Sequence, residues 1–168
     1  MSDRSGIFAG DDPFRIAQRW LGEAEANELN DPNAIALATV DSQGLPNVRM
    51  VLLKDIEDDA FVFYTNYGSA KAEDIAHNPQ VSLLFPWNEL DRQVSVSGRV
   101  EKIAETESDA YFAARPRASQ IAAWTSQQSQ PIASRSVLEH QYQETLRRFD
   151  GSDVPRPPHW GGFRLVPE

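Results

Sequence analysis

Residues 49–87 read RMVLLKDIEDDAFVFYTNYGSAKAEDIAHNPQVSLLFPW, and they contain the most regular pattern in the chain. The apolar segments 47–53 and 60–65 flank an acidic turn at 57–59 and each end in polar residues. Gly68-Ser69 then leads into a predicted helix over 70–78, which Pro79 ends. Another apolar segment, 81–85, follows the proline. Apolar runs separated by turn residues predict antiparallel hairpins with one inserted helix.

The segments on either side extend this pattern. Asp12-Pro13 pairs a capping acid with a proline at the first helical position, which predicts a helix from residue 13 to about residue 28. Thr106 and Asp109 predict a capping box for a helix through residue 114. Further strands are expected at 34–40, 93–103 and 162–166, and further helices at 119–124 and 138–149. Five or six strands with helices inserted late predict a mainly β protein, a small antiparallel barrel with flanking helices.

Composition restricts the classes of function. The chain has 168 residues, which predicts one domain over 1–168, with a mobile tail at 1–11. It carries 25 acidic against 16 basic residues, which argues against general binding to nucleic acid or anionic membranes. It has no cysteine, so disulfides and thiolate metal sites are excluded. The polar, acidic start and the lack of any apolar run of roughly 20 residues predict a cytoplasmic protein.

The basic residues point to a local anion site. The chain has three lysines, and Lys54 and Lys71 both lie in the 49–87 stretch with Arg49. Helix N-termini favour phosphate, and arginine adds bidentate hydrogen bonds. A phosphate cradle is therefore predicted from Arg49, Lys54, Tyr64, Thr65, Ser69 and Lys71. The alternative is that cations at strand ends are merely solvated, with Ser69 only capping the helix.

A second polar group follows in the last third of the chain. Tyr111 and Arg115 are four residues apart, so on a helix they share a face, and Ser119 follows one turn later. A phenol, a guanidinium and a hydroxyl together can hold a second phosphate. The alternative, favoured by the spacing alone, is a surface helix whose tyrosine packs on the barrel. No dinucleotide or Walker A motif occurs, and the three histidines lack metal-ligand spacing.

Many segments in one order resemble the pyridoxamine 5′-phosphate oxidase family of FMN enzymes. The similar segments are RMVLLK at 49–54, FYTN at 63–66, GSAKA at 68–72, NPQVSLLFPW at 78–87, RQV at 92–94, YFAARPRASQIAAW at 111–124, QQS at 127–129 and WGGFR at 160–164. The resemblance implies a Greek-key split β-barrel and a homodimer with FMN at the subunit interface. It also implies oxidation of pyridoxamine or pyridoxine 5′-phosphate to pyridoxal 5′-phosphate, with hydride transfer to flavin N5 and O2 reduced to hydrogen peroxide.

The resemblance also assigns residues to the two anion sites. With Ser69 of the cradle added, the predicted cofactor-binding residues are Arg49, Met50, Val51, Leu52, Leu53, Lys54, Tyr64, Thr65, Ser69, Lys71, Gln93, Gln128 and Ser129. The residues that match the family's substrate-phosphate contacts are Lys54, Tyr111, Arg115 and Ser119. No side chain is assigned as an obligatory acid or base. The alternatives are a non-catalytic FMN-binding protein and an oxidase of the same fold acting on another substrate, such as a phenazine precursor.

The chain departs from the family pattern in two places. The family usually has arginine where Ala70 stands, so one flavin phosphate contact is expected to be missing. The sequence ends at Glu168, whereas family members continue with a strand that bears a tryptophan and an arginine beside the flavin, and with an Arg-x-His that contacts the substrate. Ending after Val166 would leave the last hairpin unpaired and its edge exposed, so we expect a trimmed sequence. The alternative is a protein with a reduced substrate site.

Overall fold

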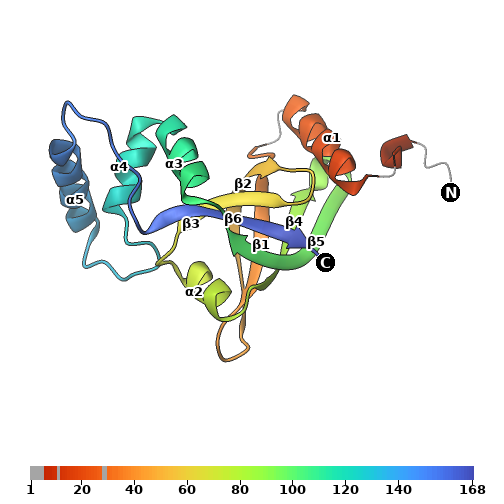
Figure 1. The fold of residues 1–168 in the computed structure, drawn as a ribbon, viewed down its shortest axis with the longest axis horizontal. Helices are drawn as coiled ribbons and strands as arrows, with labels where there is room; N and C mark the ends of the chain where they lie inside the picture. Colours follow the sequence, from red (N-terminus) through yellow and green to blue (C-terminus); the bar gives the residue numbers. More distant parts are fainter. Residues whose placement is uncertain (1–5, 11, 28–29) are drawn as a thin grey trace.

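A computed structural model of the protein describes residues 6–10, 12–27 and 30–168 (Figure 1). Within these residues, six strands form a closed barrel in the order β1-β2-β3-β6-β5-β4, and every neighbouring pair is antiparallel. The strands are β1 (Ala34–Val40), β2 (Pro46–Ile56), β3 (Phe61–Asn66), β4 (Gln80–Trp87), β5 (Arg92–Lys102) and β6 (Trp160–Pro167). The predicted mainly β antiparallel barrel is confirmed.

Helices surround this barrel on several sides. They are η1 (Gly6–Phe8), α1 (Pro13–Ala26), α2 (Ala70–His77), η2 (Asn88–Leu90), α3 (Glu105–Ala114), α4 (Arg117–Thr125) and α5 (Arg135–Arg148). Figure 1 shows α3, α4 and α5 grouped beside one end of the barrel and α1 at the other end, with α2 on a separate side. In the described part of the chain, no helix has the length and apolarity to cross a bilayer.

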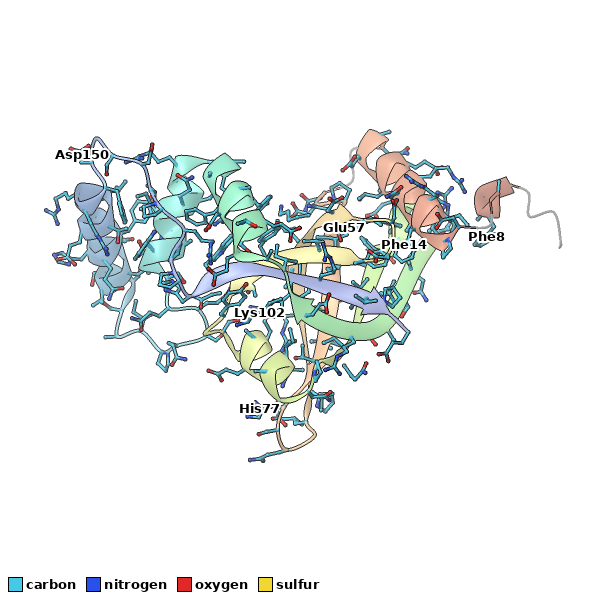
Figure 2. All side chains as sticks on the ribbon, in the orientation of Figure 1. Phe8, Phe14, Glu57, His77, Lys102 and Asp150 are labelled. Carbon is cyan, nitrogen blue, oxygen red and sulfur yellow. The ribbon has the colours of Figure 1, made fainter. Side chains whose placement is uncertain are left out.

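The barrel core follows the two-residue period of its strands. In β1 and β4, alternate residues point inward, and Ile35, Leu37 and Phe85 are fully buried. Helix α1, which carries Phe14 (Figure 2), covers one end of this core. The Phe14 ring lies 5.5 Å from the Phe61 ring. The predicted cap of α1 is confirmed, since the Asp12 carboxylate accepts a 2.9 Å hydrogen bond from the Phe14 amide.

Strand β6 has partners on both sides, so the expected unpaired last hairpin is wrong. Its register with β3 runs from Trp160 opposite Asn66 to Leu165 opposite Phe61, and it also pairs with the second half of β5. A Cβ atom at Gly98 would lie 2.1 Å from the Val166 carbonyl oxygen, so the glycine permits this close approach. The barrel therefore closes within the residues present here.

Some local predictions differ from the structure. The capping box is wrong because α3 begins at Glu105, one residue before Thr106, and the Ala104 amide donates to Glu107 instead. Helix α5 has no buried residue, and Leu138, expected on its apolar face, is 40% exposed. The predicted end of the first helix near residue 28 and residues 1–5 and 11 of the predicted tail lie outside the described residues. Residues 6–8 form η1.

Candidate functional site

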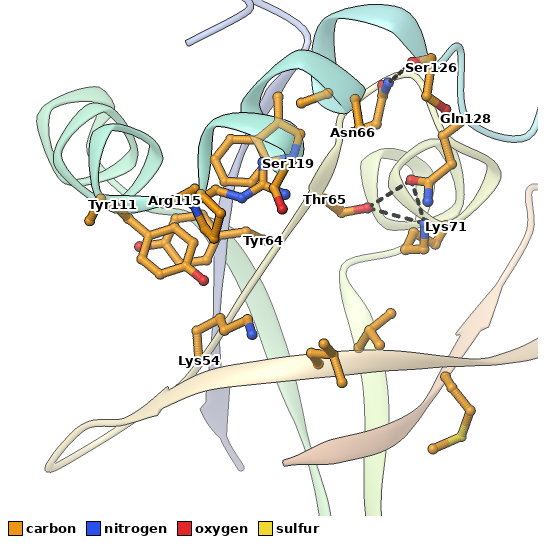
Figure 3. Close-up of a pocket in the computed structure, with 18 residues that line it drawn as sticks. Lys54, Tyr64, Thr65, Asn66, Lys71, Tyr111, Arg115, Ser119, Ser126 and Gln128 are labelled. Atoms are coloured by element: carbon orange, nitrogen blue, oxygen red, sulfur yellow. Dashed lines mark hydrogen bonds between the residues drawn. The ribbon is translucent and has the colours of Figure 1, made fainter. Parts of the chain in front are cut away.

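A cavity of about 610 Å³ lies between β2, β3 and the α3–α4 region (Figure 3). Its volume is typical of small-molecule sites, which span roughly 300–1,000 Å³. Its walls combine basic, aromatic and small apolar side chains. The lining residues are Met50, Val51, Leu52, Lys54, Tyr64, Thr65, Asn66, Lys71, Tyr111, Ala114, Arg115, Pro116, Ser119, Ala122, Ala123, Ser126, Gln128 and Trp160.

Lys71 forms one end of the cavity. It lies in the first turn of α2 and is 6% exposed. Its ammonium donates to three neutral oxygens: Thr65 Oγ1 at 3.1 Å, Ser69 Oγ at 3.1 Å and Gln128 Oε1 at 3.0 Å. Burial, and secondarily the charge of Arg49, lowers the pKa of Lys71 to about 8. A desolvated ammonium held by neutral oxygens at a helix N-terminus is suited to an anion.

Ser69 supports this lysine rather than the helix. Its hydroxyl is fully buried, donates a 2.7 Å hydrogen bond to the Asn66 carbonyl and accepts from Lys71. Although Ser69 occupies the N-cap position of α2, its side chain makes no capping hydrogen bond. The alternative in which Ser69 only caps the helix is therefore wrong.

A second basic group lies at the other end of the cavity, where Lys54 on β2 faces Tyr111, Arg115 and Ser119 (Figure 3). Burial lowers the pKa of Lys54, and the nearby charge of Arg115 lowers it further. Burial also lowers the pKa of Arg115, and Tyr111 partly offsets this effect. Two desolvated cations that repel each other gain free energy when an anion binds between them.

Arg115 reaches the cavity by a different route from the one predicted. Helix α3 ends at Ala114, and Arg115 follows it with extended backbone angles, φ −71° and ψ 149°. Pro116 explains this geometry, since a residue before proline is disfavoured in the helical region. Arg115 therefore does not share a helical face with Tyr111, yet both side chains line the cavity.

Stacked aromatic rings form the wall behind Arg115. The Tyr64 and Tyr111 rings stack with centroids 3.9 Å apart, and Tyr64 also stacks on Trp160 at 5.3 Å. Burial and the proximity of Tyr111 raise the pKa of Tyr64 to about 12. The Tyr64 hydroxyl is therefore neutral at physiological pH and can donate a hydrogen bond to a ligand.

The structure brings together some of the predicted residues and separates others. Among the predicted residues, those outside the cavity lining are Arg49, Leu53, Ser69, Gln93 and Ser129. Arg49 hydrogen bonds to Thr39 and Asp74, whereas Leu53 is a core residue. Gln93 is exposed on β5, and Ser129, with φ 67°, borders a separate cavity of about 280 Å³.

Several lining residues were not predicted from the sequence, above all Asn66, Ser126 and Trp160. The Asn66 amide donates a 3.2 Å hydrogen bond to the Ser126 carbonyl and so joins the end of β3 to the end of α4. Asn66 and Trp160 lie within the FYTN and WGGFR segments, so their place in those motifs was the available signal.

The donor set is suited to a flavin that carries a terminal phosphate. Lys71 provides a buried positive charge for that phosphate, beside the polar groups of Thr65 and Gln128, and the β2 segment of Met50, Val51 and Leu52 provides a mostly apolar wall. The group around Arg115 remains available for a second anion. The fold and this cavity together define a split-barrel protein whose candidate site has two basic ends.

Comparisons with known proteins identify the family. The family model described as pyridoxamine 5′-phosphate oxidase matches residues 21–148, and the chain belongs to this family of flavin-dependent oxidoreductases. A relative from Cereibacter sphaeroides, named pyridoxine/pyridoxamine 5′-phosphate oxidase, is 56% identical over 98% of this chain and 82% of its own. A relative of the same name from Azorhizobium caulinodans is 54% identical over 97% and 77%. The predicted family and the prediction of an enzyme are confirmed.

Solved structures agree on the fold. PhzG from Burkholderia lata 383, in complex with tetrahydrophenazine-1-carboxylic acid, matches with a TM-score of 0.88 and 30% identity, over 94% of this chain and 77% of that chain. An FMN binding protein from Nostoc punctiforme, described as pyridoxamine 5′-phosphate oxidase-related, matches with a TM-score of 0.72 and 18% identity, over 94% and 82%. The second match supports the fold alone.

Proposed function

We propose that this protein oxidises pyridoxamine or pyridoxine 5′-phosphate to pyridoxal 5′-phosphate, with FMN as cofactor and O2 as acceptor. The observation that carries the proposal is the pair of basic ends in one cavity, Lys71 at one end and Lys54 with Arg115 at the other. Two phosphate-bearing molecules, the cofactor and the substrate, would account for both ends. The names of the relatives from Cereibacter and Azorhizobium support this choice of substrate.

The side chains would act mainly by binding and orientation. Lys71, Thr65 and Gln128 would hold the FMN phosphate, and Lys54, Tyr111, Arg115 and Ser119 would hold the substrate phosphate. When bound, FMN would accept the hydride from the substrate, and O2 would take up the two electrons with two protons to give hydrogen peroxide; with pyridoxamine 5′-phosphate, water would be consumed and ammonia released. Fixing two reactants by their phosphates converts an encounter in solution into a reaction within one site, which can account for much of the rate. We assign no obligatory acid or base.

The exposed face of β2 supports a homodimer with FMN at the subunit interface. Val48, Met50 and Leu52 point outward on alternate positions and are 67%, 56% and 43% exposed. A row of exposed apolar side chains is typical of an interaction surface. Met50 and Leu52 also line the cavity, so a second copy packed on this strand would border the cofactor site. We also propose a cytoplasmic location, which cell fractionation would test.

A second candidate is oxidation of a phenazine precursor, and the similarity to PhzG favours it. The four substrate-phosphate side chains, with Lys54 and Arg115 desolvated together, argue for a phosphorylated substrate instead. A third candidate is a protein that binds FMN without catalysis.

One experiment separates these candidates. Protein purified without added cofactor is expected to be yellow and to release FMN on denaturation, as identified by chromatography; FAD or no flavin would contradict the cofactor assignment. Pyridoxine 5′-phosphate is then added under air, and hydrogen peroxide and pyridoxal 5′-phosphate are measured. Equal amounts of both products support the proposal. Peroxide only with a reduced phenazine carboxylate favours the second candidate, and no peroxide with either compound favours FMN binding alone.

A further inference from the structure

Trp160, the first residue of β6, is buried beneath the second basic end of the cavity. It is 7% exposed, and its ring belongs to the aromatic group that includes Tyr64, Tyr111 and Phe112. Trp160 and Tyr111 are almost parallel, with an interplanar angle of 4°, and Phe112 meets Trp160 edge-on at 5.1 Å. These contacts on several sides fix the plane of the indole.

The guanidinium of Arg115 lies on this indole. Its central carbon is 4.5 Å from the Trp160 ring centroid and 5.6 Å from that of Phe112. The Nη1 atom of Arg115 is buried and has no hydrogen-bond partner among the described residues. Several arginines of the described chain form ion pairs with carboxylates, but Arg115 forms none there. Aromatic contacts, rather than a carboxylate, therefore hold its charge.

Polar contacts fix the start of β6 against α3, the helix that leads to Arg115. The Arg156 guanidinium donates to the Trp160 carbonyl at 2.7 Å and to the Asp109 carboxylate at 2.6 Å. Ser108, also on α3 and fully buried, accepts a 3.1 Å hydrogen bond from the Gly162 amide. The strand that carries the indole and the helix that leads to the arginine are thus joined at Trp160 and again at Gly162.

We propose that Trp160 is a positioning residue for the substrate phosphate: its indole face holds Arg115 so that the unpaired Nη1 is available to a phosphate group. This inference rests on the proposed function, because it assigns the phosphate of the substrate to Arg115. A carboxylate partner would hold the arginine equally well, but it would compete with the phosphate for the guanidinium. An aromatic face attracts the cation without occupying its donors.

The test measures binding to the FMN-loaded protein by calorimetry, with inorganic phosphate and pyridoxal 5′-phosphate as separate probes. Removing a cation–π contact by Trp160→Leu is expected to weaken the binding of both probes about 2- to 30-fold. Trp160→Phe keeps an aromatic face for the guanidinium, so its loss of affinity should be smaller. Binding of pyridoxal, which lacks the phosphate, should change less than twofold in either variant.

A double-mutant cycle shows whether Trp160 acts through Arg115. In an Arg115→Ala background, Trp160→Leu should have no further effect on phosphate binding. Additive losses, or equal losses for pyridoxal and pyridoxal 5′-phosphate, would overturn the proposal. If Trp160→Leu does not fold, Trp160→Phe takes its place in the cycle. The proposal would be overturned if a folded Trp160→Phe Arg115→Ala protein bound phosphate with full affinity. It would also be overturned if Trp160→Phe caused the same loss of phosphate affinity with and without Arg115.

Trp124 provides the matched control, since Arg148 lies 4.6 Å over its ring and neither residue lines the cavity. Trp124→Leu should leave phosphate binding within twofold. Inorganic phosphate as a probe also separates this inference from the proposed function. A coupled loss between Trp160 and Arg115 in a protein that does not oxidise pyridoxine 5′-phosphate would support the positioning role and refute only the reaction.

Discussion

Replacing Lys71 with methionine should weaken FMN binding without destabilising the flavin-free protein. Lys71 is 6% exposed and its ammonium is bonded only to neutral oxygens, so it remains a desolvated charge in the absence of an anion. Methionine has a similar length and no charge. Its introduction removes the desolvation cost, and the Thr65 hydroxyl can still donate to Gln128, at a distance of 3.1 Å in the present structure.

The expected decrease in affinity follows from the charge-assisted hydrogen bond that the Lys71 ammonium would donate to the flavin phosphate in exchange for one of its three bonds to neutral oxygens. A hydrogen bond to a charged group contributes about 1.5–3 kcal/mol. Removing one such bond corresponds to an increase in Kd of about 10- to 150-fold. The melting temperature of the flavin-free variant should equal or exceed that of the unchanged protein, because an uncompensated buried charge has been removed.

Fluorescence titration of FMN measures the affinity, and thermal unfolding of flavin-free protein measures stability. Lys102→Met is the control, because Lys102 lies on β5 outside the cavity, over the Tyr67 ring at 4.3 Å. Arg115→Ala is a second control, which should weaken the binding of pyridoxine 5′-phosphate and leave the affinity for FMN unchanged. An unchanged Kd in Lys71→Met, or release of FMN by Arg115→Ala with substrate binding intact, would refute the assignment of the two ends.

Other variants and conditions test different parts of the structure. FMN affinity should fall as pH rises above about 8, where Lys71 loses its proton in the free protein while the bound phosphate favours the charged form; a Kd independent of pH from 7 to 9.5 would contradict this. Light scattering should show a dimer for the unchanged protein and a monomer for Val48→Glu, which places a charge on the exposed apolar face; a monomer with tightly bound FMN would exclude the shared site. Gly162→Ala should cost about 1–3 kcal/mol of stability and lower FMN affinity, because the added Cβ would lie 2.4 Å from Ile103 and 2.8 Å from Tyr64; a variant with unchanged melting and affinity would show that both side chains can move aside.

The fold could be predicted largely from local patterns. The Asp12-Pro13 start, the apolar period in 34–40 and the helix that stops before Pro79 each depend on neighbouring residues, and each element appears where the pattern indicates. The pairing of β6 on both of its edges could not be predicted in this way. Whether a last strand finds one partner or two depends on how the sheet closes, which is a long-range property set by β3 and β5.

In the site, too, some residues could be predicted from the sequence pattern and others depend on long-range packing. Scarcity of lysine pointed to Lys54 and Lys71, and both line the cavity. Pattern alone could not place Arg115, because Pro116 turns it out of the helix that its spacing suggested. Trp160 is 45 residues from Arg115 in sequence, and only the packing of β6 beneath α3 brings the indole and the guanidinium together.

The buried cations at the two ends of the cavity lower the stability of the flavin-free protein and favour the binding of anions. Lys71, Lys54 and Arg115 have pKa values lowered first by burial, so each costs stability in the flavin-free protein. An anion at either end offsets that cost, and binding to the folded state alone stabilises it in proportion to the logarithm of the ligand concentration. FMN and a substrate phosphate should therefore each raise the melting temperature. Because they occupy different ends, the two increases should be nearly additive in free energy, whereas two ligands competing for a single basic group could not both contribute.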